Sequence, residues 1–257
     1  MTPASALIAL RHILEPARSA AFFTDFDGTL SSIVTDPAAA KPVPGAMDSL
    51  AGLRGTLGRV TVVSGRPVSF LASHVPESID LVGLYGAERR IGGVFETDER
   101  VAAWHDPVSA VVAAAAESAP AGMRVEDKGL SLTLHYREVP ELEDAVIAWA
   151  ESQATLTGLV RRGARMSQEL HPPVPVDKGS VVTELAEGFD QVVYCGDDAG
   201  DLSAFQALTR MRDEGRSVLR VVAQGRGTPR EVVELADAIT DGPAELVAVL
   251  KDLVAGD

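Results

Sequence analysis

The chain has 257 residues, of which 46% are hydrophobic and 23% charged, and its formal net charge is −14. This length allows one large domain or a core with a smaller second domain, and the negative charge argues against nucleic acid or an anionic membrane as a partner. No segment approaches the roughly 18 consecutive apolar residues of a membrane-spanning helix, and Met1 to Leu10 lacks the features of a secretion signal. With a single cysteine as well, we expect a soluble, cytoplasmic protein.

The first predicted strand ends in two acidic residues. It follows an amphipathic helix expected within residues 1–19, and its apolar residues Phe22 and Phe23 lead directly to Asp25. Because side chains alternate along a strand, Asp25 and Asp27 share one side, and a glycine directly after them lets the chain turn. Two neighbouring carboxylates repel each other, and a hard cation such as Mg²⁺ relieves the repulsion. The pair therefore predicts a metal site.

Further Val-rich runs alternate with helical patterns, and each run ends on Gly, Ser or Asp. The predicted strands after the first are Arg59 to Val63, Asp80 to Tyr85, Gln191 to Cys195 and Val218 to Val222. This alternation predicts βαβ units and therefore an α/β fold with a Rossmann-like parallel sheet. Polar residues follow the strands, at the edge where open α/β sheets bind ligands.

The middle of the chain, from Trp104 to His171, has an αββαββ pattern. Its predicted elements are an Ala-rich helix, strands at Met123 to Val125 and Leu130 to Tyr136, a helix from Glu141 to about Gln153, and strands at Leu159 to Arg162 and Ala164 to Leu170. Turns at Asp127-Lys128-Gly129 and Arg162-Gly163 favour antiparallel hairpins. We therefore expect residues 101–171 to form an inserted α+β cap domain, and residues 1–100 and 172–257 to form the catalytic core.

Four short segments carry residues suited to phosphoryl transfer. Asp25 is a candidate nucleophile that can form an aspartyl-phosphate, and Asp27 can protonate the leaving oxygen and then deprotonate water. Ser64, at a turn that opens a helix, can hold a phosphoryl oxygen, and Lys178 can neutralise the charge on the transferring group. Asp197 and Asp198, in a Gly-Asp-Asp run after a strand, can complete the metal site. Each segment alone is also typical of a turn or a helix cap, but together their order favours catalysis.

These segments resemble the four motifs of the haloacid dehalogenase superfamily of phosphatases. The matching residues are Asp25 to Leu30, Ser64-Gly65-Arg66, Asp177-Lys178-Gly179 and Gly196-Asp197-Asp198. More narrowly, the sequence is similar to the trehalose-phosphate phosphatase family in Asp25 to Val34 with Pro37, the Ser-Gly-Arg step, Tyr85-Gly86-Ala87-Glu88 and the inserted cap. The resemblance implies a core of the haloacid dehalogenase type and a Mg²⁺-dependent hydrolase that removes phosphate from trehalose 6-phosphate in trehalose biosynthesis.

The resemblance also implies residue roles. Asp25 would be the nucleophile, Asp27 the acid and base, and Ser64 and Lys178 would bind phosphate. Mg²⁺ would be held by Asp25, the backbone carbonyl of Asp27 and Asp197. Asp198 and Asp201 would contact these ligands rather than the metal itself. The residues that would bind the sugar hydroxyls are Arg66, Glu88, Lys128, Arg137 and Glu169. His135 would also bind them unless its side chain faces solvent.

Two motifs depart from the family pattern. The fourth motif usually continues as Gly-Asp-Asp-x-Thr-Asp-Glu, whereas this chain has Gly200 and Leu202 in place of Thr and Glu, and His171 replaces the arginine of a Glu-x-Arg-Pro step. The metal acids remain, so we expect hydrolysis to survive while substrate choice loosens. Sucrose 6-phosphate, glucosylglycerol phosphate or mannosyl-phosphoglycerate stay open as alternative substrates, and so does a non-catalytic sugar-phosphate sensor or scaffold. The sequence does not determine the oligomeric state, although a monomer is favoured.

Overall fold

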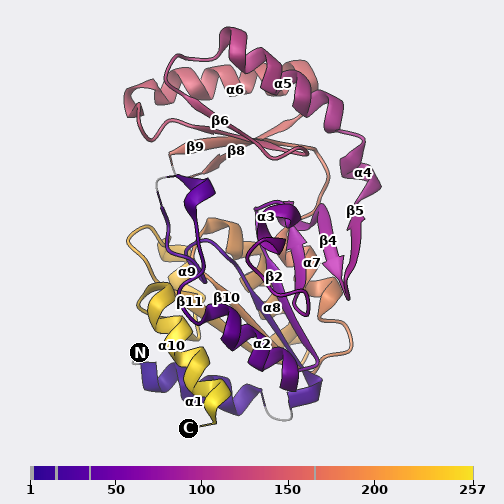
Figure 1. Cartoon of the computed structure of the whole chain (residues 1–257), viewed down its shortest axis with the longest axis vertical. Coiled ribbons are helices and arrows are strands. Elements are labelled where there is room, and N and C mark those ends of the chain that lie inside the picture. The colour runs from indigo at the N-terminus through magenta and orange to yellow at the C-terminus, as the bar shows by residue number, and fades with distance from the viewer. Residues whose placement is uncertain (1–2, 15–16, 35, 165, 257) are drawn as a thin grey trace. The chain divides into compact units, whose positions relative to one another are not determined.

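The computed structural model describes residues 3–14, 17–34, 36–164 and 166–256, and the chain divides into two compact units (Figure 1). The first unit comprises Met1–Glu96 and Val176–Asp257, and the second comprises Thr97–Pro175. The second unit is therefore an insertion in the first, and the chain passes between them twice. Among the described residues, no helix combines the length and the apolar character that crossing a membrane requires.

The first unit is built on an eight-stranded sheet with the strand order β12-β11-β10-β1-β2-β3-β4-β5. Its strands are β1 (Ala20–Thr24), β2 (Arg59–Val63), β3 (Asp80–Gly83), β4 (Glu88–Ile91), β5 (Val94–Thr97), β10 (Gln191–Gly196), β11 (Ser217–Ala223) and β12 (Ala238–Thr240). The strands from β12 to β3 pair in parallel, whereas β4 is antiparallel to β3. The predicted parallel α/β core is confirmed, and β1 lies inside it with every residue buried.

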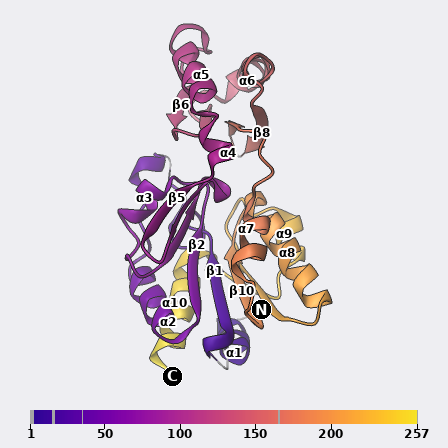
Figure 2. The same cartoon turned by 90° about the vertical axis from the view of Figure 1, so that its right-hand side faces the viewer.

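Helices cover both faces of this sheet (Figure 2). The helices of the first unit are α1 (Pro3–Ile13), α2 (Ala46–Thr56), α3 (Val68–Ala72), α7 (Lys178–Leu185), α8 (Leu202–Asp213), α9 (Arg230–Glu234) and α10 (Gly242–Ala255). Helices α1, α2, α3 and α10 share one apolar cluster with Phe22, and α7, α8 and α9 share a second cluster with Phe23. Neighbouring residues of β1 thus pack against helices on opposite faces of the sheet, as strand alternation requires. The expected N-terminal helix is present as α1, while residues 1–2 and 15–16 lie outside the described residues.

The β4–β5 hairpin is an element that the sequence analysis omitted. A Gly92-Gly93 turn connects the two strands, and both glycines have positive φ, 57° and 83°. Such a Gly-Gly pair between short strands is typical of a hairpin. All four residues of β5 are exposed, so this strand lacks the apolar alternation that would have marked it.

The second unit has a four-stranded antiparallel sheet in the order β6-β7-β9-β8. Its elements are α4 (Glu99–Ala102), α5 (His105–Ser118), β6 (Arg124–Asp127), β7 (Leu132–His135), α6 (Glu143–Thr157), β8 (Val160–Ala164) and β9 (Ser167–His171). From α5 onward this is the predicted αββαββ order. The prediction of a turn at Arg162-Gly163 is wrong, because both residues lie within β8. Leu132, Leu134 and Leu170 pack with α5 and α6 on one face of the sheet, which leaves polar residues on the other face.

Candidate active site

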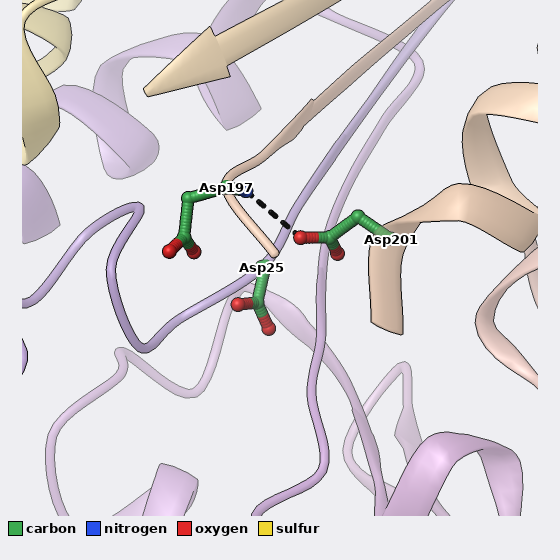
Figure 3. Close-up of side chains that lie close together, drawn as sticks. All are labelled: Asp25, Asp197 and Asp201. Carbon is green, nitrogen blue, oxygen red and sulfur yellow. Dashed lines mark hydrogen bonds between the residues drawn. The ribbon is translucent and has the colours of Figure 1, made fainter. Parts of the chain in front are cut away.

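Three buried carboxylates meet at the carboxyl ends of β1 and β10. Asp25 follows β1, Asp197 follows β10, and Asp201 ends the short turn before α8. One oxygen of each lies within 4.8 Å of the others (Figure 3). Because β1 and β10 are parallel neighbours, their ends lie at the same edge of the sheet. Two of the residues expected to bind a metal, Asp25 and Asp197, are therefore brought together.

Burial and mutual repulsion raise the pKa of two carboxyl groups of this cluster, Asp25 and Asp197. Burial is the main reason that the pKa of Asp197 rises to about 9, and repulsion from Asp25 and Asp201 adds to it. Burial likewise raises the pKa of Asp25 well above its usual value, although the positive charge of Lys178 opposes the shift. A bound divalent cation would favour the ionised form of both acids. The electrostatics of the cluster therefore suit a cation.

Asp201 is held by four donors. Its Oδ1 accepts hydrogen bonds from Nζ of Lys178 at 2.7 Å and from the hydroxyl of Tyr194 at 2.6 Å. Its Oδ2 accepts from the backbone N–H groups of Asp197 and Asp198, at 2.8 and 3.0 Å. Both oxygens are thus already engaged, so Asp201 fixes the loop and the lysine rather than offering an oxygen to a metal.

Asp25 and Asp197 each have an oxygen that can take a cation. Oδ1 of Asp25 accepts from Lys178 at 2.8 Å, and Oδ1 of Asp197 accepts from the hydroxyl of Thr29 at 3.1 Å. Among the described residues nothing donates to Oδ2 of either acid. Gly28, with φ of 82°, makes room for Asp197, since a β-carbon there would lie 2.1 Å from that Oδ2. Carboxylate oxygens are what Mg²⁺ prefers, so these residues fit such an ion.

Lys178 is a buried cation between two carboxylates. Its ammonium group lies 2.8 Å from Asp25 and 2.7 Å from Asp201. Burial alone would lower the pKa of Lys178, but the two carboxylates outweigh it and raise the pKa well above its usual value. The lysine begins α7, where Asp177 caps the helix by accepting the N–H of Ser180 at 2.7 Å. A fixed positive charge therefore lies beside Asp25.

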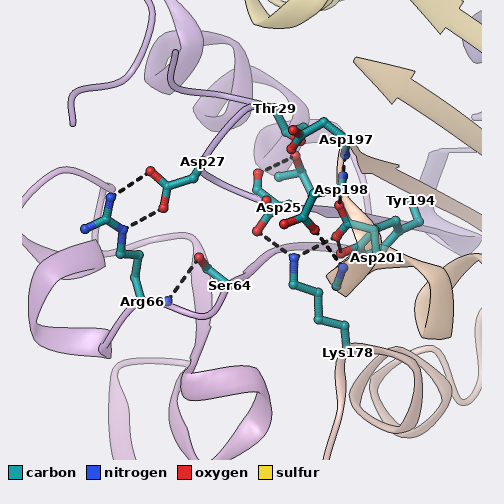
Figure 4. A network of polar contacts seen from close by, with 12 residues as sticks. Asp25, Asp27, Thr29, Ser64, Arg66, Lys178, Tyr194, Asp197, Asp198 and Asp201 are labelled. Carbon is teal, nitrogen blue, oxygen red and sulfur yellow. Dashed lines mark hydrogen bonds and ion pairs between the residues drawn. The ribbon is translucent and has the colours of Figure 1, made fainter. Parts of the chain in front are cut away.

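Asp27 is paired with Arg66 rather than with the acidic cluster. Nε and Nη2 of Arg66 donate to its two carboxylate oxygens at 2.6 and 2.8 Å. The guanidinium group also lies over the ring of Phe70, 4.4 Å from its centroid, and the backbone N–H of Arg66 donates to Oγ of Ser64 at 3.2 Å. Figure 4 shows Asp27 and Arg66 on one side of Asp25, and Lys178 and Asp201 on the other. Arg66, which was expected to bind the sugar, thus contacts Asp27, the candidate general acid and base.

Glu88, also expected on the sugar, contacts backbone in this structure. Its Oε2 accepts the N–H of Val68 at 2.7 Å, the first residue of α3. The first N–H groups of a helix have no partner within it, so Glu88 supplies one. It thereby stabilises the start of the helix that follows Ser64.

The remaining predicted residues lie in the second unit, on the polar face of its sheet or near it. Nζ of Lys128 lies 3.2 Å from Glu169, and Nε2 of His135 lies 2.8 Å from a carboxylate oxygen of Glu126. Glu126 and Glu169 are both in register with Thr133 of β7, which places them on one face. Arg137 follows β7 and is exposed.

Comparison with known proteins identifies the family. A family model described as trehalose-phosphatase matches residues 23–231. The chain belongs to the trehalose-phosphatase family. A trehalose-phosphate phosphatase of Mycolicibacterium paratuberculosis is 34% identical over 205 residues, which are 74% of this chain and 52% of that protein. An uncharacterized glycosyl hydrolase of Mycobacterium tuberculosis is 32% identical over 207 residues, 74% of this chain but 15% of that protein.

The chain therefore spans about half the length, or less, of these relatives. Among solved structures, the C-terminal domain of the C. albicans trehalose-6-phosphate phosphatase superposes with a TM-score of 0.78 at 21% identity, covering 98% of each chain. At that identity the match concerns the fold alone. The family resemblance and the haloacid dehalogenase-type fold expected from the sequence are both confirmed.

Three polar residues of this trehalose-phosphatase family member were given no role by the sequence analysis. Thr29 donates to Asp197, Tyr194 donates to Asp201, and Glu126 pairs with His135. Tyr194 could have been noticed because its hydroxyl interrupts an otherwise apolar strand directly before Gly-Asp-Asp, and a buried tyrosine hydroxyl requires a partner. Glu126 lies opposite Thr133, which is two residues before His135 on β7, so Glu126 and His135 share one face of the sheet.

Proposed function

We propose that the protein is a divalent-metal-dependent phosphatase that hydrolyses trehalose 6-phosphate to trehalose and inorganic phosphate. The observation that carries the proposal is the buried contact of Asp25 with Lys178, beside Asp197, in a chain of the trehalose-phosphatase family. A buried carboxylate held in place beside a fixed ammonium group is suited to attack phosphorus. The fixed ammonium group offsets the charge that develops on the transferring phosphoryl group.

The reaction proceeds in two displacements. A carboxylate oxygen of Asp25 attacks phosphorus, the bond from phosphorus to the sugar oxygen breaks, and Asp27 transfers its proton to that oxygen. Water then attacks the phosphorus of the aspartyl-phosphate and gives its proton to Asp27. The bond to Asp25 breaks, inorganic phosphate leaves, and both carboxyl groups return to their starting states. Ser64 and Lys178 hold the phosphoryl oxygens throughout.

Arg66 controls the availability of Asp27 in this scheme. Both carboxylate oxygens of Asp27 accept hydrogen bonds from the guanidinium group, whereas the first step needs Asp27 to donate a proton to the sugar oxygen. The contact with Arg66 must therefore open before Asp27 can protonate the sugar oxygen. Substrate binding supplies an alternative anionic partner for the arginine.

Mg²⁺ is the metal that we propose, held by Asp25, the backbone carbonyl of Asp27 and Asp197. When bound, it polarises the phosphoryl oxygens and offsets the negative charge of the acidic cluster. A readout other than activity tests this assignment. Mg²⁺ should raise the melting temperature of the wild type, because a ligand of the native state stabilises it. The Asp197→Asn variant should respond much less, and an equal response would contradict the assignment.

We further propose that the second unit, with boundaries near residues 101 and 171, is a cap domain that binds the sugar. A disaccharide presents many hydroxyl groups, which charged donors and acceptors recognise well and select strictly. Lys128 and Glu169 are already paired and can exchange partners for hydroxyls, and Glu126 lies on the same face as Glu169. Arg137 is expected to assist. The substrate is thus a small sugar phosphate, and the chain is expected to act as a monomer.

The decisive experiment measures phosphate release with Mg²⁺ from trehalose 6-phosphate, sucrose 6-phosphate, glucose 6-phosphate and an aryl phosphate, with Asp25→Asn as a control. Selective hydrolysis of trehalose 6-phosphate that Asp25→Asn abolishes is the expected result. Hydrolysis of another sugar phosphate alone would retain the chemistry and replace the substrate, an outcome favoured by Gly200 and Leu202 in the fourth motif. Absence of turnover on every ester would point to a sugar-phosphate sensor.

A further inference from the structure

The residue Tyr85 lies in a backbone conformation that is costly for its side chain. Leu84 and Tyr85 have φ of 47° and 59°, so two successive residues other than glycine occupy the left-handed region. Bulky residues rarely adopt this conformation, and such strain is concentrated at functional sites. Leu84 donates its N–H to the carbonyl of Arg66, and Tyr85 donates to that of Ser64, both at 3.0 Å. The turn is therefore tied directly to the segment proposed to bind phosphate.

The phenol ring of Tyr85 lies between two glycines that belong to different motifs. A β-carbon at Gly65 would lie 2.7 Å from both Cζ and the hydroxyl oxygen of the ring, and 3.1 Å from Cε2. A β-carbon at Gly200 would lie 3.7 Å from Cε1, on the opposite edge. The ring thus fills the space between the turn after Ser64 and the turn after Asp198. The absence of a side chain at Gly65 makes room for the ring, whereas a β-carbon at Gly200 would only touch its edge.

Packing within the core does not account for this position. Tyr85 is half-buried, and neither apolar cluster of the first unit includes it. Its ring lies beside Gly65, which is the residue directly after Ser64. A phosphate ester whose phosphoryl group is held at Ser64 therefore places its alcohol group close to an aromatic surface with a polar tip. Such a surface suits the mixed apolar and hydroxyl character of a sugar ring.

We propose that Tyr85 is a specificity-determining residue whose ring packs against the sugar ring that carries the phosphate. This inference rests on the proposed function and adds a contact within the first unit to the sugar contacts proposed for the cap. The ring selects esters of a pyranose over esters of a smaller alcohol. Gly65 acts with it, because a side chain at that position would displace the ring.

The test compares kcat/KM for glucose 6-phosphate and trehalose 6-phosphate with that for glycerol 2-phosphate, an alkyl ester without a sugar ring. Tyr85→Ala should lower the preference for both sugar esters about tenfold, mainly through KM. Gly65→Ala should lower it as well by displacing the ring, so the test does not depend on whether Tyr85→Ala folds. Tyr85→Phe keeps the ring and should retain most of the preference. The matched control is Phe95→Ala, which removes an aromatic ring that is 63% exposed on β5 and should leave the preference unchanged.

The double variant separates this role from general damage. If Gly65→Ala acts by moving the ring, then adding it to Tyr85→Ala should change the preference no further. Independent, additive effects would overturn the inference, and so would a Tyr85→Phe variant as unselective as Tyr85→Ala. If the wild type prefers sugar esters and the variants keep this preference, only the role of Tyr85 is refuted. A wild type that hydrolyses none of the esters would refute the proposed function and this inference with it.

Discussion

The two units hold their charged groups in different ways. In the first unit, Asp25 and Asp197 follow neighbouring parallel strands, and Asp201 fixes the loop through four hydrogen bonds. In the second unit, Lys128, in the turn after β6, pairs with Glu169 of β9, side chain to side chain. Backbone-fixed acids are preorganised for a reaction, whereas side chains on a sheet surface can exchange partners. Substitutions of the clustered acids in the first unit should therefore change mainly kcat, and substitutions of Lys128 or Glu169 in the second unit mainly KM.

The largest effect is expected for Asp25→Asn. The amide cannot form the aspartyl-phosphate, so kcat for trehalose 6-phosphate should fall by roughly 10⁴-fold or more. Because burial raises the pKa of Asp25, ionising this group is unfavourable in the metal-free protein, and its removal should not lower the melting temperature. Kinetics and thermal unfolding on the same preparation check both parts. A variant that keeps a tenth of the wild-type kcat would exclude Asp25 as the nucleophile.

Asp201→Asn tests whether the loop that Asp201 fixes supports the reaction, in addition to the residues that bind the metal. The amide cannot accept from all four donors, so the apparent Mg²⁺ affinity or kcat should fall by roughly 10–100-fold. The free energy of unfolding should fall by about 3 kcal/mol, since charged hydrogen bonds are lost in a buried site. Magnesium titration of activity and urea unfolding measure these quantities. Asp213→Asn, at an exposed position at the end of α8, is the matched control, and equal effects of the two substitutions would refute the role of Asp201.

The difference between the units also explains how far the sequence could predict the structure. The acids at the end of β1 were predictable, because Asp25, Asp27 and Gly28 are contiguous and follow an apolar run. The pairing of Asp27 with Arg66 was not, because it joins residues 39 positions apart through side-chain conformations. Likewise, the contact of Glu88 with the start of α3 leaves no local pattern in the sequence. The β4–β5 hairpin was missed because its exposed strand carries no alternation.

Lys128→Met tests the sugar-binding role of the second unit. It removes the donor that faces Glu169 while keeping a side chain of similar length. KM for trehalose 6-phosphate should rise by roughly 10–100-fold with a much smaller change in kcat, because a binding contact outside the reacting groups is lost. Glu169→Gln should shift KM in the same direction. Steady-state kinetics on trehalose 6-phosphate and on an aryl phosphate distinguish the parameters, and a loss of kcat as large as that of Asp201→Asn would contradict the division of roles between the units.

The smallest effect is expected at Asp237, a carboxylate of the first unit that has no part in the reaction. Burial alone would raise the pKa of Asp237, but hydrogen bonds from Arg220 and Arg212 outweigh it and lower the pKa below its usual value of 3.8. A group with a lowered pKa in the folded state stabilises the protein above its unfolded pKa, and this contribution disappears as the pH falls through the folded pKa. Because the side chain is 22% exposed, Asp237→Asn should lower the free energy of unfolding by only about 1 kcal/mol near neutral pH, and kcat should not change.

Urea unfolding of the wild type and Asp237→Asn at neutral and acidic pH checks this prediction. The gap between the two proteins should narrow as the pH falls below the usual carboxyl range, because the wild-type carboxylate becomes protonated and loses its charged hydrogen bonds. Glu234→Gln is the matched control, since Glu234 pairs with Arg230 on the surface of α9 and exposed pairs contribute less than about 1 kcal/mol. A gap that widens in acid would mean that Asp237 is protonated in the native state, and a loss of kcat would connect this ion pair to the site after all.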